Sequence, residues 1–221
     1  YFLWDRDNRG LCKVITNLNN KESFPMERSL LEKGSDTFIR YNESITILHK
    51  VINQTEVFID TLVSPQTPFG FVTSFKGYGK SKKNNIKMYI SGGHNYVSEE
   101  SVEKGKELIN TFKVFIPKAG SGSDKFPHSI LGKPFVGEPM SICNQTYLTI
   151  GPLQSEDYCY NLIKYIHTRF FRFMVMLKKN TQDAMRGTYS FVPYLNLNEP
   201  WTDEKLYKKY NLTQEEIDFI E

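Results

Sequence analysis

The chain has 221 residues, enough to bury a full core in one large domain or two small ones. Its composition, 39% hydrophobic and 24% charged, is ordinary for a globular protein, and no apolar run reaches the roughly eighteen residues of a membrane-spanning helix. We expect no secretory leader, because no basic segment precedes an apolar one near the start. The three cysteines, Cys12, Cys143 and Cys159, are widely separated. This spacing argues against a disulfide framework or a zinc knuckle and favours a reducing cytoplasm.

The net charge of +3 conceals an uneven distribution. Residues 1–70 carry 8 basic and 9 acidic side chains, residues 71–198 carry 17 and 9, and residues 199–221 carry 3 and 7. The middle of the chain therefore holds the excess positive charge that a polyanionic partner requires. A solvated lysine-rich surface would have the same composition.

The first part of the chain predicts short strands around one helix. Residues 1–3 and 11–16 are expected to form a hairpin through a polar turn. Asn42 can cap a helix whose apolar positions follow helical spacing. Residues 69–75 alternate as a strand, turn at two glycines, and return at 86–90.

The middle of the chain predicts further strands. Ser98 can cap a short helix, and residues 113–117 and 140–151 have the composition of strands. Between these strands lies a Gly/Ser/Pro/Lys-rich stretch at 118–133, which predicts a loop.

The last third predicts helices. Ser155 can cap a long helix that continues to Lys179 and has one broad apolar face. A short strand at 189–193 is expected to follow, then a helix that begins at Thr202. Asn211 can end that helix, and residues 213–216 have capping-box spacing for a last one. Together these elements predict an α+β fold with a mixed sheet, a long amphipathic helix and short C-terminal helices.

Familiar catalytic and nucleotide-binding motifs are incomplete in this chain. Gly79-Lys80-Ser81 lacks the earlier glycine of a phosphate-binding loop, because Ser74 occupies that position, and it precedes a strand. The four histidines are dispersed, so their spacing does not predict a zinc site. Asp203-Glu204-Lys205 has the local order of a metal-dependent nuclease, but it falls in a first helical turn, where acids are expected. A nuclease using Asp203 and Glu204 stays open as an alternative hypothesis.

Three basic segments indicate that the chain binds DNA. The first, 76–87, has five lysines and no acid, and its asparagines could read adenine edges. The second is the loop 118–133, whose small residues let backbone N–H groups approach a phosphate. The third comprises the long helix and the residues that follow it, from Lys164 to Arg186. Each segment alone could be a solvated surface. Three such segments in a chain that has no recognisable set of catalytic residues favour a binding function. The predicted DNA-binding residues are Lys76, Lys80, Lys82, Lys83, Asn84, Asn85, Lys118, Ser121, Ser123, Lys125, Arg169, Arg172, Lys179, Gln182 and Arg186.

Several passages, among them Pro68-Phe-Gly70, Lys113-Val-Phe-Ile-Pro117 and Phe191-Val-Pro193, resemble bacterial adenine-specific (N6) DNA methyltransferases of restriction–modification systems. Residues 1–7 with Gly10 look like the strand and turn that follow the methyltransferase core of that family. The family's target-recognition domain is resembled at Pro68-Phe-Gly70, at Lys113-Val-Phe-Ile-Pro117, and through Ile163–Phe173, Lys179–Gln182 and Phe191-Val-Pro193. The resemblance covers most of the chain.

The resemblance departs from the family at its catalytic motifs. Asn198-Glu-Pro-Trp201 has a glutamate where the Asn-Pro-Pro-aromatic motif has a proline, and Phe75-Lys-Gly-Tyr-Gly79 reads better as a hairpin tip than as a turn for S-adenosylmethionine. The chain lacks an initiator methionine and ends within a helical pattern. We therefore expect a fragment of a longer protein, whose catalytic half is absent.

The resemblance implies a division of roles within a parent enzyme. The parent would transfer a methyl group from S-adenosylmethionine to adenine N6, and this chain would read double-stranded DNA while the catalytic domain of the same parent holds the flipped base. No cofactor or metal is expected in the fragment, and no membrane partner. Residues 1–20 would end the preceding methyltransferase region, 21–198 would form the target-recognition domain, and 199–221 a C-terminal helical segment. The alternative is a protein-interaction module of a multi-subunit restriction–modification complex, docking through the acidic tail and Trp201.

Overall fold

Strand β7 (Phe112–Pro117) runs through the middle of the fold and separates two hydrophobic cores. Val114 and Ile116 point into the larger core, whereas Phe115 belongs to the smaller one. This division follows from the alternation of side chains along a strand. The computed structural model of the chain describes residue 3 and residues 5–7, 10–18, 21–79, 85–120 and 130–221.

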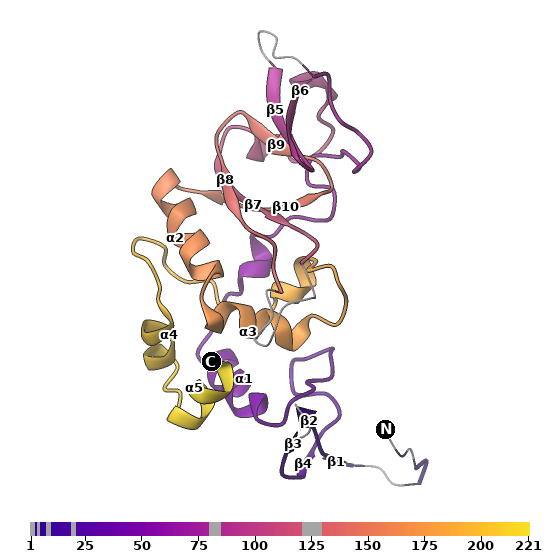
Figure 1. The fold of residues 1–221 in the computed structure, drawn as a ribbon, viewed down its shortest axis with the longest axis vertical. Coiled ribbons are helices and arrows are strands. Elements are labelled where there is room, and N and C mark those ends of the chain that lie inside the picture. The colour runs from indigo at the N-terminus through magenta and orange to yellow at the C-terminus, as the bar shows by residue number, and fades with distance from the viewer. Residues whose placement is uncertain (1–2, 4, 8–9, 19–20, 80–84, 121–129) are drawn as a thin grey trace.

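Two three-stranded sheets meet at β7 (Figure 1). The first has the order β10-β7-β8 and is antiparallel, with β8 at Phe135–Gly137 and β10 at Tyr147–Leu153. The second has the order β6-β5-β9, with β5 at Asn85–Ile90, β6 at Gly93–Ser98 and β9 at Ser141–Cys143. Strand β5 pairs antiparallel with β6 and parallel with β9, so this sheet is mixed, as predicted.

Helices surround the larger core at the other end of the molecule (Figure 1). They are α1 (Ser44–Ile52), α2 (Glu156–Ile166), α3 (Arg169–Lys178), α4 (Asp203–Lys209) and α5 (Gln214–Ile220). Short 3₁₀ turns lie at η1 (Ile59–Thr61), η2 (Glu99–Ser101), η3 (Lys106–Leu108) and η4 (Arg186–Tyr189). The α+β class predicted from the sequence is confirmed.

The N-terminal strands form two small ribbons beside α1 (Figure 1). Strand β1 (Cys12–Val14) pairs with β4 (Met26–Arg28), and β2 (Asn17–Leu18) pairs with β3 (Lys21–Glu22). The predicted partner of the 11–16 strand was residues 1–3. Residues 1 and 2 of that predicted partner fall outside the described residues, Leu3 is not in a strand, and β1 pairs with β4.

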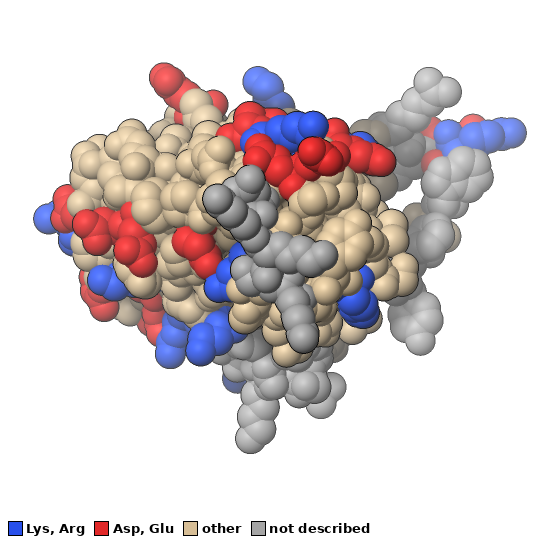
Figure 2. Space-filling model, turned by 90° about the horizontal axis from the view of Figure 1, so that it is seen from above, with Lys and Arg blue, Asp and Glu red and all other residues tan. Residues whose placement is uncertain are grey.

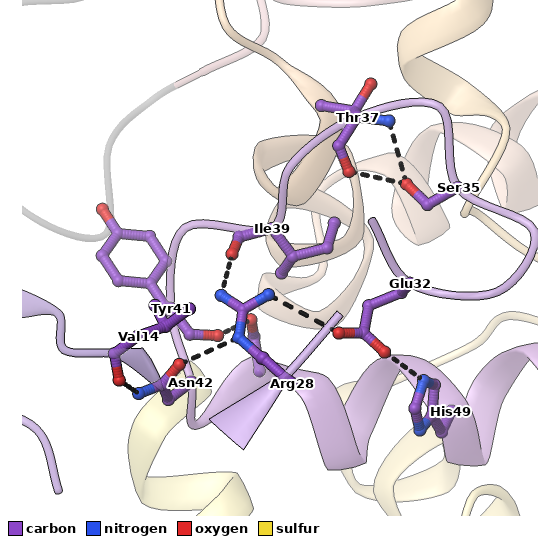
Figure 3. A network of polar contacts seen from close by, with 10 residues as sticks. Val14, Arg28, Glu32, Ser35, Thr37, Ile39, Tyr41, Asn42 and His49 are labelled. Carbon is purple, nitrogen blue, oxygen red and sulfur yellow. Dashed lines mark hydrogen bonds and ion pairs between the residues drawn. The ribbon is translucent and has the colours of Figure 1, made fainter. Parts of the chain in front are cut away.

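A chain of polar contacts fastens these ribbons to α1 (Figure 3). Arg28 is 5% exposed, and its guanidinium donates to Asn42 Oδ1 at 3.1 Å and to the carbonyl of Ile39 at 2.5 Å. Its third nitrogen lies 3.5 Å from Glu32, whose other oxygen is 3.0 Å from His49 on α1. A buried charge costs several kcal/mol unless it is paired in this way, so the network fixes the position of the N-terminal segment.

Asn42 takes part in this network. The sequence predicted that Asn42 would cap α1, but in the structure it does not. Its amide donates to the carbonyl of Val14 at 2.9 Å, and its oxygen accepts from Arg28. The residue before α1 is Glu43, which makes no side-chain capping bond. A buried guanidinium needs acceptors, and this demand takes precedence over a cap of about 1 kcal/mol.

The predicted long helix is in fact two helices, with the break at His167 and Thr168. Thr168 is extended, and its hydroxyl accepts from the N–H of Phe171, which caps α3. The carboxylate of Asp203 accepts from the N–H groups of Arg169 and Phe170 at 3.1 and 2.9 Å. The N–H groups of the first turn of α3 therefore all have hydrogen-bond acceptors, so the break between the two helices costs little free energy.

Three other predicted strands differ from the structure. Residues 69–75 form turns, and β5 pairs with β6 instead of returning to them. The stretch 140–151 divides into β9 and β10, which belong to different sheets. Residues 189–193 contain the end of η4 and a single bridge from Pro193 to Phe58. Each error concerns pairing with a distant segment, which local alternation does not specify.

Candidate nucleic-acid interface

The first basic segment lies at the end of the molecule that carries β5 and β6. Among its predicted DNA-binding residues the structure describes Lys76 and Asn85, and the remaining ones, Lys80, Lys82, Lys83 and Asn84, fall outside the described residues. Lys76 is exposed, and its carbonyl accepts from the amide of Asn95 on β6. Asn85 begins β5 and pairs with Ser98 across the hairpin. Two described residues do not by themselves make a binding surface.

Lys87, the last lysine of this segment, is held by a carboxylate. Its ammonium lies 2.8 Å from Glu138, and the hydroxyl of Tyr89 donates to the same carboxylate at 2.8 Å. Burial disfavours the charged ammonium, but the hydrogen bonds and charges of Glu138 and Tyr89 outweigh burial and raise the pKa of Lys87. Glu138 offsets its charge, so Lys87 adds little to a positive field.

The second segment begins at Lys118, at the base of a loop. Gly120 and Ile130, on either side of the undescribed residues 121–129, lie against each other, because a Cβ on Gly120 would be 2.2 Å from the carbonyl oxygen of Ile130. Only glycine permits so close an approach. Gly132 packs in the same way on Pro117, so Lys118 and Lys133 lie on neighbouring stems. The predicted contacts Ser121, Ser123 and Lys125 fall outside the described residues.

The third segment divides between the two ends of α3. Arg169, at the start, forms an ion pair with Glu221 and donates to the carbonyl of that residue. Arg172 and Lys179, the residue that directly follows α3, are seven residues apart, which is close to two helical turns, so they lie toward the same side of α3. Arg186, after the helix, is exposed and donates to the carbonyl of Asp60 at 3.0 Å.

The structure brings the second segment together with the exit of α3. Ala119 and Asp183 form an antiparallel bridge, the N–H of Ala184 donates to the carbonyl of Lys118 at 2.7 Å, and Gly120 donates to Gln182. Lys133 and Arg172 both act on the pKa of His167, which lies between α2 and α3. We call the resulting area the loop-base surface and define it by Lys118, Lys133, Arg172, Lys179 and Gln182.

Electrostatics at the loop-base surface are positive but not uniform. The pKa of His167 is lowered, first by burial and then by the charges of Arg172 and Lys133, so it stays neutral more readily than a free histidine. Burial also lowers the pKa of Lys179, and nearby Asp183 opposes that change. Asp183 lies 3.4 Å from the ammonium of Lys118 and partly offsets its charge.

The sequence did not assign Lys133 or His167 to the binding set. The useful signal was the glycine at 132, which allows the second stem of the loop to lie against Pro117. At the β5–β6 end, viewed from above in Figure 2, basic and acidic side chains are interspersed among broad uncharged areas. The described residues of that face therefore do not form a continuous basic area.

The structure gives Asp203 and Trp201 structural partners. Both oxygens of Asp203 accept from the first N–H groups of α3, and the described residues contain no group of His, Cys, Asp or Glu that could hold a metal ion. The indole of Trp201 donates to the carbonyl of Asn196 at 2.8 Å and packs on the larger core. Asn198 accepts from the hydroxyl of Tyr158. These contacts argue against a nuclease centred on Asp203 and against docking through Trp201.

Cys143 and Cys159 are buried, and neither is suited to act as a nucleophile. Burial raises the pKa of each thiol to about 12, and the charge of Lys113 opposes the change only in part. Both therefore remain protonated near neutral pH. No described helix has the length and apolar composition needed to cross a membrane.

Comparison with protein-family models and with curated proteins finds no match to this chain.

Proposed function

We propose that this chain binds double-stranded DNA as the target-recognition region of a bacterial adenine-N6 DNA methyltransferase. The resemblance in its sequence motivates the proposal, and the convergence of two basic segments at the loop-base surface supports it most directly. S-adenosylmethionine and the reacting adenine would be held by the catalytic domain of the parent enzyme. The proposed setting is the bacterial cytoplasm.

The arrangement of side chains suggests how the loop-base surface would meet a duplex. Lys118, Lys133, Arg172 and Lys179 would contact phosphates and position the domain, since phosphate contacts carry no sequence information. Gln182 is exposed next to the Ala119–Asp183 bridge, and a glutamine amide can pair with the N6 and N7 edge of adenine in the major groove. Asp183 would limit nonspecific attraction by offsetting the charge of Lys118.

The salt dependence of binding tests this arrangement. Each phosphate contact contributes roughly 0.9 to the slope of log affinity against log salt, so replacing both Lys118 and Lys179 with Ala should lower the slope by about 1.8. The matched control replaces Lys208 and Lys209, which are exposed on α4, and should leave it unchanged. Fluorescence anisotropy with a labelled duplex gives both slopes. If the slope fell by the same amount in both double variants, the loop-base surface would not be part of the interface.

Asp183 supplies an independent test with the opposite sign. Asp183→Asn removes the carboxylate that lies 3.4 Å from Lys118 and should strengthen binding to duplex DNA at low salt. The effect should vanish when Lys118 is also replaced with Ala. A gain that survives the Lys118 replacement would mean that Asp183 acts through net charge alone.

The second candidate function, a protein-interaction module, is favoured by one observation. Apolar side chains are unusually exposed in the N-terminal part, where Leu11 is 62%, Phe24 94% and Leu30 59% exposed. Apolar surface of this kind is typical of a docking site. Such a module would bind DNA weakly and without salt dependence, so the anisotropy experiment separates the two functions.

A further inference from the structure

A pocket of about 360 Å³ opens beside the C-terminal end of α3. It lies where the ends of α1 and α3 meet the segment that follows η4, and its lining includes Asp36, Ile52, Phe58, Lys178, Ser190 and Phe191. Three apolar side chains and three polar ones surround it. Apolar side chains combined with a few placed polar groups are typical of small-molecule sites, and the volume falls in the usual range.

Lys178 supplies the only ammonium among the described residues that line this pocket, and its position is fixed. The side chain is 15% exposed, its Nζ lies 5.0 Å from the centre of the Phe191 ring, and it donates to the hydroxyl of Ser190 at 2.7 Å. The alkyl chain of Lys178 is packed, and its ammonium is hydrogen-bonded to the hydroxyl of Ser190, which can itself donate a hydrogen bond. Such an arrangement presents two donors, an ammonium and a hydroxyl, to an anionic group.

Asp36 now occupies the place of that anion. Its carboxylate lies 2.9 Å from Lys178, yet its side chain is 77% exposed. The hydrogen bond from Lys178 lowers the pKa of Asp36, with a smaller contribution from Thr37, so the carboxylate is charged near neutral pH. Exposed ion pairs are weak, and an entering anion can therefore displace this one.

We propose that the pocket binds a small aromatic anion, whose phosphate or carboxylate pairs with Lys178 and Ser190 while its ring packs against Phe58 and Phe191. Apolar contact and a charge-assisted hydrogen bond then act together, which neither a neutral aromatic compound nor a bare anion can reproduce. The site does not depend on the proposed DNA function. The same chemistry is present in a free metabolite and in a nucleotide of a nucleic acid.

Calorimetric titration of the full chain with phenyl phosphate tests the proposal. Benzyl alcohol and inorganic phosphate serve as the neutral and ring-free probes, and both should bind at least tenfold more weakly. Losing a charge-assisted hydrogen bond costs about 1.5–3 kcal/mol, so Lys178→Met should weaken phenyl phosphate roughly tenfold or more. Ser190→Ala should weaken it by a smaller factor and retains the packed lysine.

Asp36→Asn gives the sharpest signature, because removing the internal anion should tighten phenyl phosphate binding roughly two- to fivefold. Glu56→Gln, an exposed acid near Phe58, is the charge-matched control and should leave it unchanged. Displacement of phenyl phosphate by deoxyadenosine monophosphate and by duplex DNA would indicate a nucleic-acid source, and displacement by the nucleotide alone a free metabolite. Absence of binding to folded wild type, equal affinity in Lys178→Met and wild type, or equal affinity for inorganic phosphate would overturn the proposal.

Discussion

The buried Lys113 should make the stability of this protein rise with pH in the alkaline range. Its side chain is fully buried between the two sheets, and its ammonium donates to the carbonyls of Ile109, Thr111 and Glu138 at 3.2, 2.8 and 3.1 Å. Burial lowers the pKa of Lys113 to about 8, although the charge of Glu138 opposes the change. The ordinary value is 10.5.

The sign of the effect follows from proton binding in the two states. Between about pH 8 and 10.5 the unfolded chain keeps the proton on Lys113 while the folded protein has lost it, so the free energy of unfolding rises with pH. With 1.36 kcal/mol for each pKa unit, the rise from pH 7 to pH 10 amounts to about 2 to 3 kcal/mol. Below about pH 8 both states are protonated, and the full penalty of burying the charge remains.

Lys113→Met isolates this contribution from that of the tyrosines and cysteines, which titrate in the same range. The substitution keeps the packing, and two of the three carbonyls retain another donor, namely the N–H of Met140 for Ile109 and the hydroxyl of Ser141 for Glu138. Urea unfolding at several pH values gives the stability of each protein. The wild type should gain about 2 to 3 kcal/mol relative to the variant between pH 7 and pH 10. A constant difference would refute the argument, because it would mean that the three carbonyls hold the ammonium at its ordinary pKa.

Three further experiments test the packing described above. Arg28→Met leaves Glu32 buried with only His49 as partner and should lower the free energy of unfolding by about 3 kcal/mol in urea; adding Glu32→Gln should restore part of it, and simple additivity of the two would contradict the pairing. Asp203→Asn should cost about 1 kcal/mol by weakening the cap of α3, measured as a lower thermal midpoint, and an unchanged midpoint would contradict that role. Gly77→Ala should destabilise more than Gly79→Ala, because both glycines have φ near +75° but only at Gly77 would a Cβ meet a carbonyl oxygen, at 2.8 Å; equal losses of stability would exclude the contact as the cause.

Local signals in the sequence predicted the N-terminal caps of three helices. Ser155 caps α2, Thr202 caps α4, and Thr213 with Glu216 forms the predicted capping box of α5. Asn211, which was expected to end α4, has the left-handed backbone of such a position, with φ of 51°. Each of these features depends on residues within one or two turns, so the sequence contains the whole cause.

Features that depend on distant residues were not predictable from local patterns. The break before α3 relies on Asp203, which lies in a later helix, and β1 pairs with β4 across the intervening β2–β3 ribbon. The candidate site shows the same limit. Lys118 and Lys179 were both predicted as contacts, but only the bridge between Ala119 and Asp183 places them on one surface. Lys113 was predicted as a strand residue, and nothing in its neighbours indicated an internal ammonium.

Fluorescence anisotropy of the chain against a random pool of duplex DNA, followed by selection and sequencing, tests the central claim most directly. A target-recognition region should bind with a salt-dependent affinity and enrich one short sequence motif, and the Lys118→Ala/Lys179→Ala variant should bind the enriched duplex more weakly. Absence of binding at low salt, or binding without any enriched motif, would contradict target recognition and favour the protein-interaction module.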